Sequence, residues 1–269
     1  MGYSGPARQQ PPGGAEPVSG ISEKRILRLH KQARQQQAEQ MRLYRLIRGL
    51  LRIPFRLAFR PEVEGLENVP ESGAALIASN HRSFFDSFFQ ALVLQRPIRW
   101  MAKSELFKYP GLDWLLVELG AFPVRRGASD QEAILTAQLL LQAGEMTAVF
   151  PEGTRVREGL GEPKKGAARL ALEAQAPIIP MAIVGTQKGV LRRSMWHQGE
   201  KVRISISAPI KPAKDKPASA AEITEQQLWP EVTKQVGVLE SRRRKAIALG
   251  ALSVMAGAGL MAGRKRRKR

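Results

Sequence analysis

Residues 74–86 read AALIASNHRSFFD and contain the pattern from which we predict the architecture. The first six residues, 74–79, are apolar or small, which is the length and composition of a buried strand. A short polar turn follows, and the next residues, 85–95, have the spacing of a helix. A buried strand that runs directly into a helix is typical of an α/β fold.

Similar apolar runs recur downstream and alternate with helical patterns. The further candidate strands are residues 98–102, 121–124, 147–150, 178–184 and 202–206. The further candidate helices are residues 111–119, 130–143, 166–175 and about 221–241. This alternation predicts an α/β fold with a mixed, largely parallel sheet flanked by helices.

We divide the chain into four segments by composition. Residues 1–20 are rich in Pro and Gly and carry too little apolar surface to offset the entropy of ordering, so we expect disorder. Residues 21–60 are predicted to be a basic amphipathic helical segment that associates with membranes. Residues 61–241 form the α/β domain, and residues 242–269 are an apolar segment with basic flanks.

The segment MRLYRLIRGLLRIPFRLAF, residues 41–59, has the pattern of a basic amphipathic helix. Its arginines recur at steps of three and four residues and are expected on one face, with the leucines opposite. Pro54 is expected to kink the helix or to split it in two. Two interpretations are open: the helix packs on the core with a solvated arginine edge, or it lies in the headgroup layer of a membrane.

Residues 246–263 carry no charge and lie between the basic clusters 242–245 and 264–269. Their number is near the lower limit of about 17–25 residues for a helix that spans a bilayer. Ala and Gly dominate this stretch, so a spanning helix, a hairpin-like interfacial segment and a surface anchor are all open interpretations. The basic flanks favour contact with an anionic leaflet.

The charge balance restricts the partners. With 43 Lys and Arg against 24 Asp and Glu, the formal net charge is +19, which predicts an anionic partner such as nucleic acid or an anionic membrane. Only 6% of residues are aromatic, without the interleaving of basic and aromatic residues seen in base-stacking surfaces. The chain has no cysteine and three histidines, which excludes thiol chemistry and argues against a metal centre.

His81 and Asp86 are the first candidate catalytic pair. Five helical steps would turn their side chains about 140° apart, so they can meet only across a turn. Ser83 and Asp86 have the capping-box spacing, which predicts a helix start near Ser83 and lets the carboxylate reach the imidazole. Asp86 would then fix one ring nitrogen and leave the other as a general base. The alternative is that Asp86 is only a cap and His81 only a turn residue.

The hydroxyl of Ser83 is a candidate nucleophile. The Gly-x-Ser-x-Gly elbow that exposes the serine of a hydrolase is absent around it. Ser83 is therefore interpreted as a helix cap.

Basic side chains follow other predicted strands. Arg125 and Arg126 end the strand at 121–124, and the run FPEGTR at 150–155 follows the strand at 147–150. Lys165 lies at the start of the helix that follows. Because open α/β sheets bind ligands at the carboxyl ends of their strands, we expect these groups at one edge, where they suit a phosphate. Each arginine alone could equally be a solvated surface residue.

Four ordered segments resemble the glycerolipid acyltransferases, which include lysophosphatidic acid and glycerol-3-phosphate acyltransferases. The resemblance covers roughly residues 74–186. The four blocks are Asn80-His81 with Asp86, residues 120–126, the intact Phe-Pro-Glu-Gly-Thr-Arg at 150–155, and residues 176–184. The third block is the most specific.

The resemblance implies roles for these residues. His81 would deprotonate the acceptor hydroxyl, oriented by Asp86, and the alkoxide would attack the thioester of acyl-CoA or acyl-carrier protein. The acceptor phosphate would bind Arg125 or its neighbour Arg126, with Arg155. The remaining implied contacts are Lys165 as a weaker phosphate ligand and Glu152, Gly153 and Thr154 shaping the acceptor site. No metal, no other cofactor and no covalent acyl-enzyme is expected.

The expected activity is therefore acylation of the sn-2 hydroxyl of 1-acylglycerol 3-phosphate, giving phosphatidic acid. Alternatives are another lysophospholipid or glycerol 3-phosphate as acceptor, hydrolysis of the thioester, and, more remotely, a non-catalytic binder of anionic lipid or nucleic acid. We expect an enzyme associated with the cytoplasmic face of the cell membrane. The charge excess is then explained by phosphate-bearing lipid, and no nucleic-acid partner is expected.

Overall fold

The fold is described from a computed structural model that covers residues 22–36, 41–125, 130–156, 158–187, 201–212 and 218–266. Side chains are described as far as residue 248. The segment 1–20, for which disorder was predicted, lies outside the described residues.

Seven strands form one sheet in the order β1-β7-β6-β2-β5-β3-β4. All neighbouring pairs are parallel except β6 with β7, which is antiparallel. The strands are β1 Glu62–Glu64, β2 Ala75–Ser79, β3 Arg99–Lys103, β4 Ala121–Val124, β5 Met146–Val149, β6 Ile178–Val184 and β7 Arg203–Ile206. The predicted α/β class is confirmed. Only β1 was not predicted, because three residues with two charges carry no strand pattern.

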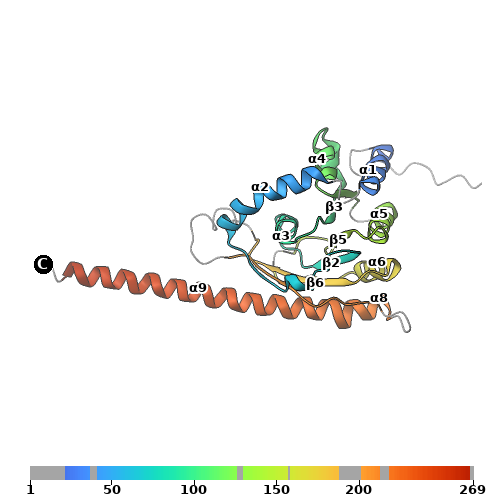
Figure 1. The fold of residues 1–269 in the computed structure, drawn as a ribbon. Helices are drawn as coiled ribbons and strands as arrows, with labels where there is room; N and C mark the ends of the chain where they lie inside the picture. The colour runs from blue at the N-terminus through green and yellow to red at the C-terminus, as the bar shows by residue number, and fades with distance from the viewer. Residues whose placement is uncertain are drawn as a thin grey trace, which may run out of the picture.

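Helices cover both faces of the sheet (Figure 1). The helices α2 Arg42–Phe59 and α3 Asp86–Val93 cover one face, and α5 Gln131–Gln142, α6 Gly166–Ala174 and α9 Trp229–Arg266 cover the other. Alternate residues of β2 point to the two layers, as the period of a strand requires. Ala75 and Ile77 pack in the layer of α2 and α3, and Leu76 and Ala78 pack in the layer of α5 and α6.

The described residues contain further helical elements. These are α1 Glu23–Gln35, the 3₁₀ turns η2 Leu66–Asn68 and η3 Ser104–Lys108, α4 Leu112–Glu118, α8 Ala220–Glu222 and the π-helical turn η4 Ile223–Leu228. The predicted C-terminal helix at 221–241 is thus a run of α8, η4 and α9.

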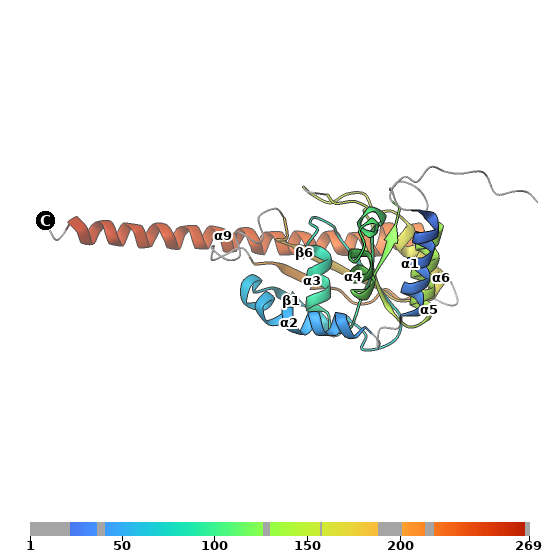
Figure 2. The same cartoon turned by 90° about the horizontal axis from the view of Figure 1, so that it is seen from above.

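The first part of the predicted membrane segment, α1, packs on the domain. Its apolar side buries Ile26 and Leu29 against a cluster that includes Phe107 and Val117 of η3 and α4. Arg34 donates to Glu132 of α5 at 2.7 Å. The contacts of α1 with α4, β4 and α5 (Figure 2) make it an integral helix of the fold.

The second part of that segment, α2, is a single helix through Pro54. Of the two outcomes expected at Pro54, a kink or a split, the split does not occur. Its apolar side chains do not share one face as expected. Tyr44, Phe55 and Phe59 pack toward the sheet, whereas an outer stripe points to solvent. This α2 outer stripe consists of Leu46, Leu50, Ile53 and Leu57, which are 59–71% exposed. At 100° per residue these four positions lie about opposite Tyr44, with arginines between the two faces.

The helix α9 runs without a break across the boundary drawn at residue 241 (Figure 1). The hairpin-like interpretation of residues 246–263 is therefore wrong, because the backbone remains helical through Arg266. The segment is rich in Ala, the best helix former, and its glycines are not sufficient to interrupt it. Among the residues whose side chains are described, no helix is long and apolar enough to cross a membrane.

His30 of α1 generates a prediction for the pH dependence of stability. Its ring is buried, Nδ1 lies 3.0 Å from the Thr136 hydroxyl, and burial lowers the His30 pKa to about 4. An unfolded histidine titrates near ~6.5, so between these values the unfolded chain binds the proton more strongly. Stability should therefore fall as the pH falls from about 6.5 toward 4.

Chemical unfolding of wild type and His30→Asn at pH 7 and pH 4.5 checks this expectation. We expect wild type to lose roughly 2–3 kcal/mol more than the variant between the two pH values. Equal losses in the two proteins would show that His30 is not the titrating group.

Candidate active site

The carboxyl ends of the parallel strands gather the candidate side chains at one edge of the sheet. The residues that follow or end these strands are His81 after β2, Glu152 and Arg155 after β5, Lys103 at the end of β3, Arg125 after β4 and Thr186 after β6. This is the edge at which open α/β sheets bind ligands. Because β2 lies between β5 and β6, His81 is near the centre of this edge.

The predicted contact between His81 and Asp86 is present. Nδ1 of His81 lies 2.9 Å from Oδ2 of Asp86, and both residues are buried. The same carboxylate oxygen accepts from the backbone N–H groups of Arg82 at 2.7 Å and Ser83 at 2.8 Å. The other oxygen, Oδ1, accepts from the hydroxyl of Thr186. With its ring proton on Nδ1, His81 is one of four donors that surround the carboxylate of Asp86.

The turn between the two residues differs from the predicted one. The helix α3 begins at Asp86 rather than near Ser83, and only half of the capping box forms. Ser83 N donates to Asp86, but Ser83 Oγ accepts from Phe85 N at 3.2 Å instead of capping the helix. The carboxylate closes a tight turn over residues 82–86, so the helix starts later than the spacing suggested.

The loop after β5 wraps around His81. The ring of Phe150 stacks on the imidazole, with centroids 3.8 Å apart and planes 15° from parallel. Glu152 is buried, and its carboxylate accepts from His81 N and Gly161 N, both at 2.9 Å. Val156 N in turn donates to the carbonyl of His81 at 2.8 Å. Glu152 therefore holds the backbone of His81 and the loop together.

Two further residues of the third block lie on the surface of the same loop. Gly153 has φ +69°, a left-handed conformation that favours glycine. A Cβ added there would lie 3.1 Å from Nζ of Lys164. Thr154 is exposed. The amine beside this turn is thus that of Lys164, the neighbour of the predicted Lys165.

Asn80 fixes the turn from the other side. Its side-chain amide donates to the carbonyl of Ile183 at 2.9 Å and accepts from the same residue's N–H at 2.8 Å. The fourth block is the strand β6, which is buried along its whole length. Asn80 therefore ties the residue before His81 to the adjacent strand β6, which supplies a rigid support.

His81 lines a cavity of about 160 Å³. Its other lining residues are Phe84, Ser87, Trp100, Met101, Ala102, Lys103, Leu106, Phe150 and Arg155. The structure therefore brings Arg155 to the same cavity as His81. It also brings Lys103, which sequence reasoning missed, although Lys103 directly follows the predicted strand 98–102.

Other predicted phosphate ligands lie away from this cavity. The guanidinium of Arg125 lies 3.5 Å from Asp130 and 3.8 Å from Glu23. Lys165 pairs with Glu225 at 3.2 Å, and both side chains are 60% exposed. Neither residue is among those that line the His81 cavity. Arg126 lies outside the described residues.

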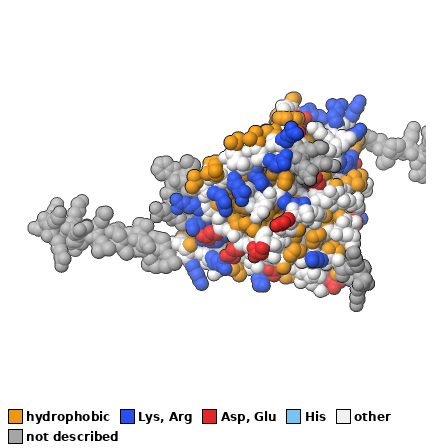
Figure 3. Space-filling model, in the orientation of Figure 1, with side chains coloured by type: hydrophobic (Ala, Val, Ile, Leu, Met, Phe, Trp, Pro, Cys, Tyr) orange, Lys and Arg blue, Asp and Glu red, His pale blue; other side chains and the backbone are white. Residues whose placement is uncertain are grey.

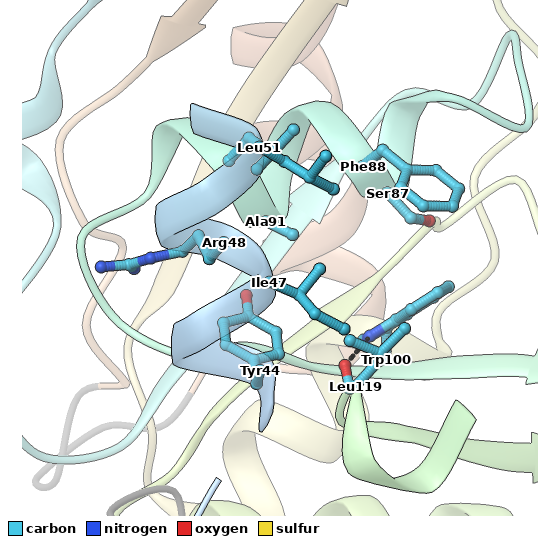
Figure 4. A pocket seen from close by; sticks show the side chains of 10 residues that line it. Tyr44, Ile47, Arg48, Leu51, Ser87, Phe88, Ala91, Trp100 and Leu119 are labelled. Carbon is cyan, nitrogen blue, oxygen red and sulfur yellow. Dashed lines mark hydrogen bonds between the residues drawn. The ribbon is translucent and has the colours of Figure 1, made fainter. Parts of the chain in front are cut away.

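A second, smaller cavity of about 50 Å³ adjoins the first and shares Ser87 and Trp100 with it. It lies between α2 and α3 and is lined by Tyr44, Ile47, Arg48, Leu51, Phe88, Ala91, Leu92 and Leu119. Figure 4 shows Ile47 and Leu51 of α2 facing Phe88 and Ala91 of α3. The indole of Trp100 is fixed by a 2.9 Å hydrogen bond to the carbonyl of Leu119.

Comparison with known proteins identifies relatives of this chain. The sequence profile of the family described as Acyltransferase matches residues 60–184. A chloroplastic 1-acyl-sn-glycerol-3-phosphate acyltransferase from Brassica napus is 32% identical over 158 residues, which are 56% of this chain and 45% of that protein. The 1-acyl-sn-glycerol-3-phosphate acyltransferase of Bacillus subtilis is 29% identical over 194 residues, which are 69% of this chain and 95% of that protein. The chain thus spans about 45% of the length of the plant relative.

The fold also matches a solved structure. The crystal structure of the 1-acyl-sn-glycerophosphate acyltransferase from Thermotoga maritima aligns with a TM-score of 0.60 at 22% identity, covering 81% of this chain and 97% of that one. This likeness establishes the fold. The profile match over residues 60–184 contains His81, Asp86 and the three other sequence blocks. Residues 60–184 therefore form an acyltransferase-family domain, and the chain is similar to 1-acyl-sn-glycerol-3-phosphate acyltransferases.

Proposed function

We propose that the protein transfers an acyl group from acyl-CoA or acyl-carrier protein to the sn-2 hydroxyl of 1-acylglycerol 3-phosphate, forming phosphatidic acid. The observation that carries this proposal is the buried His81–Asp86 pair, which opens onto a cavity that also contains Arg155 and Lys103. A general base beside two cations suits an acceptor that bears both a hydroxyl and a phosphate. The curated relatives named for this reaction support the same acceptor.

The pair supports a direct transfer. Asp86 holds the Nδ1–H of His81, so Nε2 removes the proton of the acceptor hydroxyl as its oxygen attacks the thioester carbonyl. The tetrahedral intermediate collapses, the C–S bond breaks, and the imidazolium returns the proton to the leaving thiolate. Stacking on Phe150 and the backbone bond to Glu152 hold the imidazole in place. This sequence forms one ester, releases one thiol and needs no enzyme nucleophile.

We propose that Arg155 and Lys103 bind the acceptor phosphate. Both line the cavity of His81, and an arginine fork with a lysine charge suits a phosphate dianion. Lys103 pairs with Glu105 at 2.7 Å at a half-exposed site, so the phosphate could replace this carboxylate. Arg125 is already neutralised by Asp130 and Glu23, so its role in binding is secondary in this proposal.

The apolar cavity between α2 and α3 suits the first methylenes of an acyl chain. It shares Ser87 and Trp100 with the cavity of His81, so the two cavities are neighbours, and this proposal places the start of the acyl chain in the smaller one. Each methylene transferred from water to such a site contributes about 0.8 kcal/mol.

We propose further that the protein works at a membrane surface, at the cytoplasmic face. The α2 outer stripe exposes four large apolar side chains that no part of the described chain covers. Figure 3 shows apolar side chains beside basic ones over this region of the surface. Apolar insertion with arginines at the headgroup level is the physical basis of interfacial helices.

The reaction is tested with purified protein, labelled acyl-CoA and a panel of acceptors. We expect 1-acylglycerol 3-phosphate to be acylated faster than glycerol 3-phosphate and other lysophospholipids. His81→Ala and Asp86→Asn should each lower kcat by about 10²–10⁴-fold, because the first removes the base and the second its fixed tautomer. Full activity of His81→Ala would exclude this mechanism, and preference for another acceptor would correct the substrate.

The phosphate site is tested by comparing Arg155→Ala, Lys103→Ala and Arg125→Ala. The first two should raise the KM for 1-acylglycerol 3-phosphate about tenfold or more, the loss of one charge-assisted contact. Their KM for monoacylglycerol, which lacks the phosphate, should change less than twofold. If Arg125→Ala has the largest effect, the phosphate binds at Arg125, after β4, as the resemblance to the glycerolipid acyltransferases implies.

Membrane contact is tested by flotation with anionic vesicles. Leu50→Ser combined with Ile53→Ser should weaken binding about tenfold or more, since two large apolar side chains are withdrawn from the bilayer. Leu27→Ser is the matched control, because Leu27 is exposed on α1, outside the stripe. If the double variant floats as well as wild type, and a protein truncated after residue 241 no longer floats, the membrane anchor lies in residues 242–269.

A further inference from the structure

Arg82 lies directly after His81, yet the proposed chemistry gives its side chain no role. The side chain is only 4% exposed, and it is not among the residues that line the cavity of His81. Burial of a guanidinium is unfavourable unless the charge is paired. The partners of the Arg82 guanidinium therefore indicate the role of this residue.

Arg82 connects three parts of the fold. Its backbone N–H donates to Asp86 Oδ2 at 2.7 Å, within the catalytic turn. Its Nη2 donates to the carbonyl of Gly159 at 3.0 Å, in the loop that carries Glu152. Its Nη1 donates to Glu240 of α9 at 2.5 Å. The catalytic turn is thus tied to a helix 158 residues downstream.

The position of Glu240 on α9 is itself fixed. The preceding residue, Leu239, is 2% exposed and packs with Val232 and Val236 in the cluster that also contains strands of the sheet. The side chain of Glu240 is 34% exposed, so it is partly shielded from solvent. Because α9 is packed on the sheet, the carboxylate of Glu240 has a fixed position and can orient the guanidinium of Arg82.

We propose that Glu240 is a positioning residue for acyl transfer, acting through Arg82 on the turn that joins His81 to Asp86. This inference rests on the proposed function, because it assigns a role in the reaction of that site. The ion pair holds the turn and the loop of Glu152 in one arrangement, so that Nε2 of His81 faces the acceptor hydroxyl. Displacement of a catalytic group by about 1 Å can cost about 10²-fold in rate. Because the pair does not touch substrate, its loss should affect turnover and not binding.

The experiment measures kcat and both KM values for Glu240→Gln, Arg82→Lys and the double variant. A lysine at residue 82 can reach only one of the two partners of the guanidinium. Glu64→Gln is the matched control, since Glu64 pairs with Arg242 of α9 at an exposed rim outside the catalytic turn. We expect each single variant to lower kcat about tenfold with KM values within twofold. The double variant should lose no more than the worse single one, and Glu64→Gln should keep wild-type kcat.

Thermal unfolding of every variant distinguishes positioning from general support of the fold. The inference is overturned if Glu240→Gln keeps kcat within twofold while wild type is active. It is also overturned if Glu64→Gln lowers kcat and the unfolding midpoint as much as Glu240→Gln does, because α9 would then act only as a structural brace. A wild-type protein inactive toward every acceptor would overturn the proposed function itself, and this inference with it.

Discussion

The buried carboxylate of Asp86 is the interaction on which the site depends. A buried ionised carboxylate is unfavourable unless several donors surround it. Here four donors do so, from His81, from the backbone of residues 82 and 83, and from Thr186 beyond β6. These donors come from the ends of two adjacent strands, so the carboxylate fixes one edge of the sheet as it orients the imidazole. In the proposed reaction, its charge stabilises the imidazolium that forms when His81 takes a proton.

The parallel sheet makes this arrangement possible. Parallel strands end at the same edge, so residues from sequence blocks far apart in the chain meet there. Two buried acids serve different purposes at that edge: Asp86 holds the ring of His81, and Glu152 holds its backbone. Glu152 is therefore a structural partner of His81, because its carboxylate accepts from the backbone of His81 and from Gly161 in the loop after β5. Two cations, Arg155 and Lys103, line the cavity, and Lys103 there pairs with Glu105, which an anionic ligand would have to replace.

Most of the correct predictions from the sequence rested on patterns within short segments. Buried strands have short apolar runs and helices have a distinct period, so six of the seven strands and the class of the fold were predicted correctly. The His81–Asp86 contact could be predicted because it spans one turn. Contacts between distant segments could not. The acids that pair with Arg125 are Glu23 of α1 and Asp130, the N-cap of α5. Thr186, which donates to Asp86, follows β6. The carboxylate that pairs with Arg82 belongs to α9. In α2, periodicity could not show that apolar side chains would divide between a packed face and an exposed one, because that depends on where the helix docks.

The tautomer of His81 tests the account most directly, and it can be observed without substrate. With only three histidines in the chain, nitrogen-15 NMR of histidine-labelled protein can assign each ring by comparison with a His81→Ala variant. The account predicts that neutral His81 carries its proton on Nδ1, bonded to Asp86, with Nε2 unprotonated, and that Asp86→Asn abolishes this preference. A proton on Nε2 in the wild-type protein, or rapid averaging between the two nitrogens, would contradict the claim that Asp86 prepares His81 as the base.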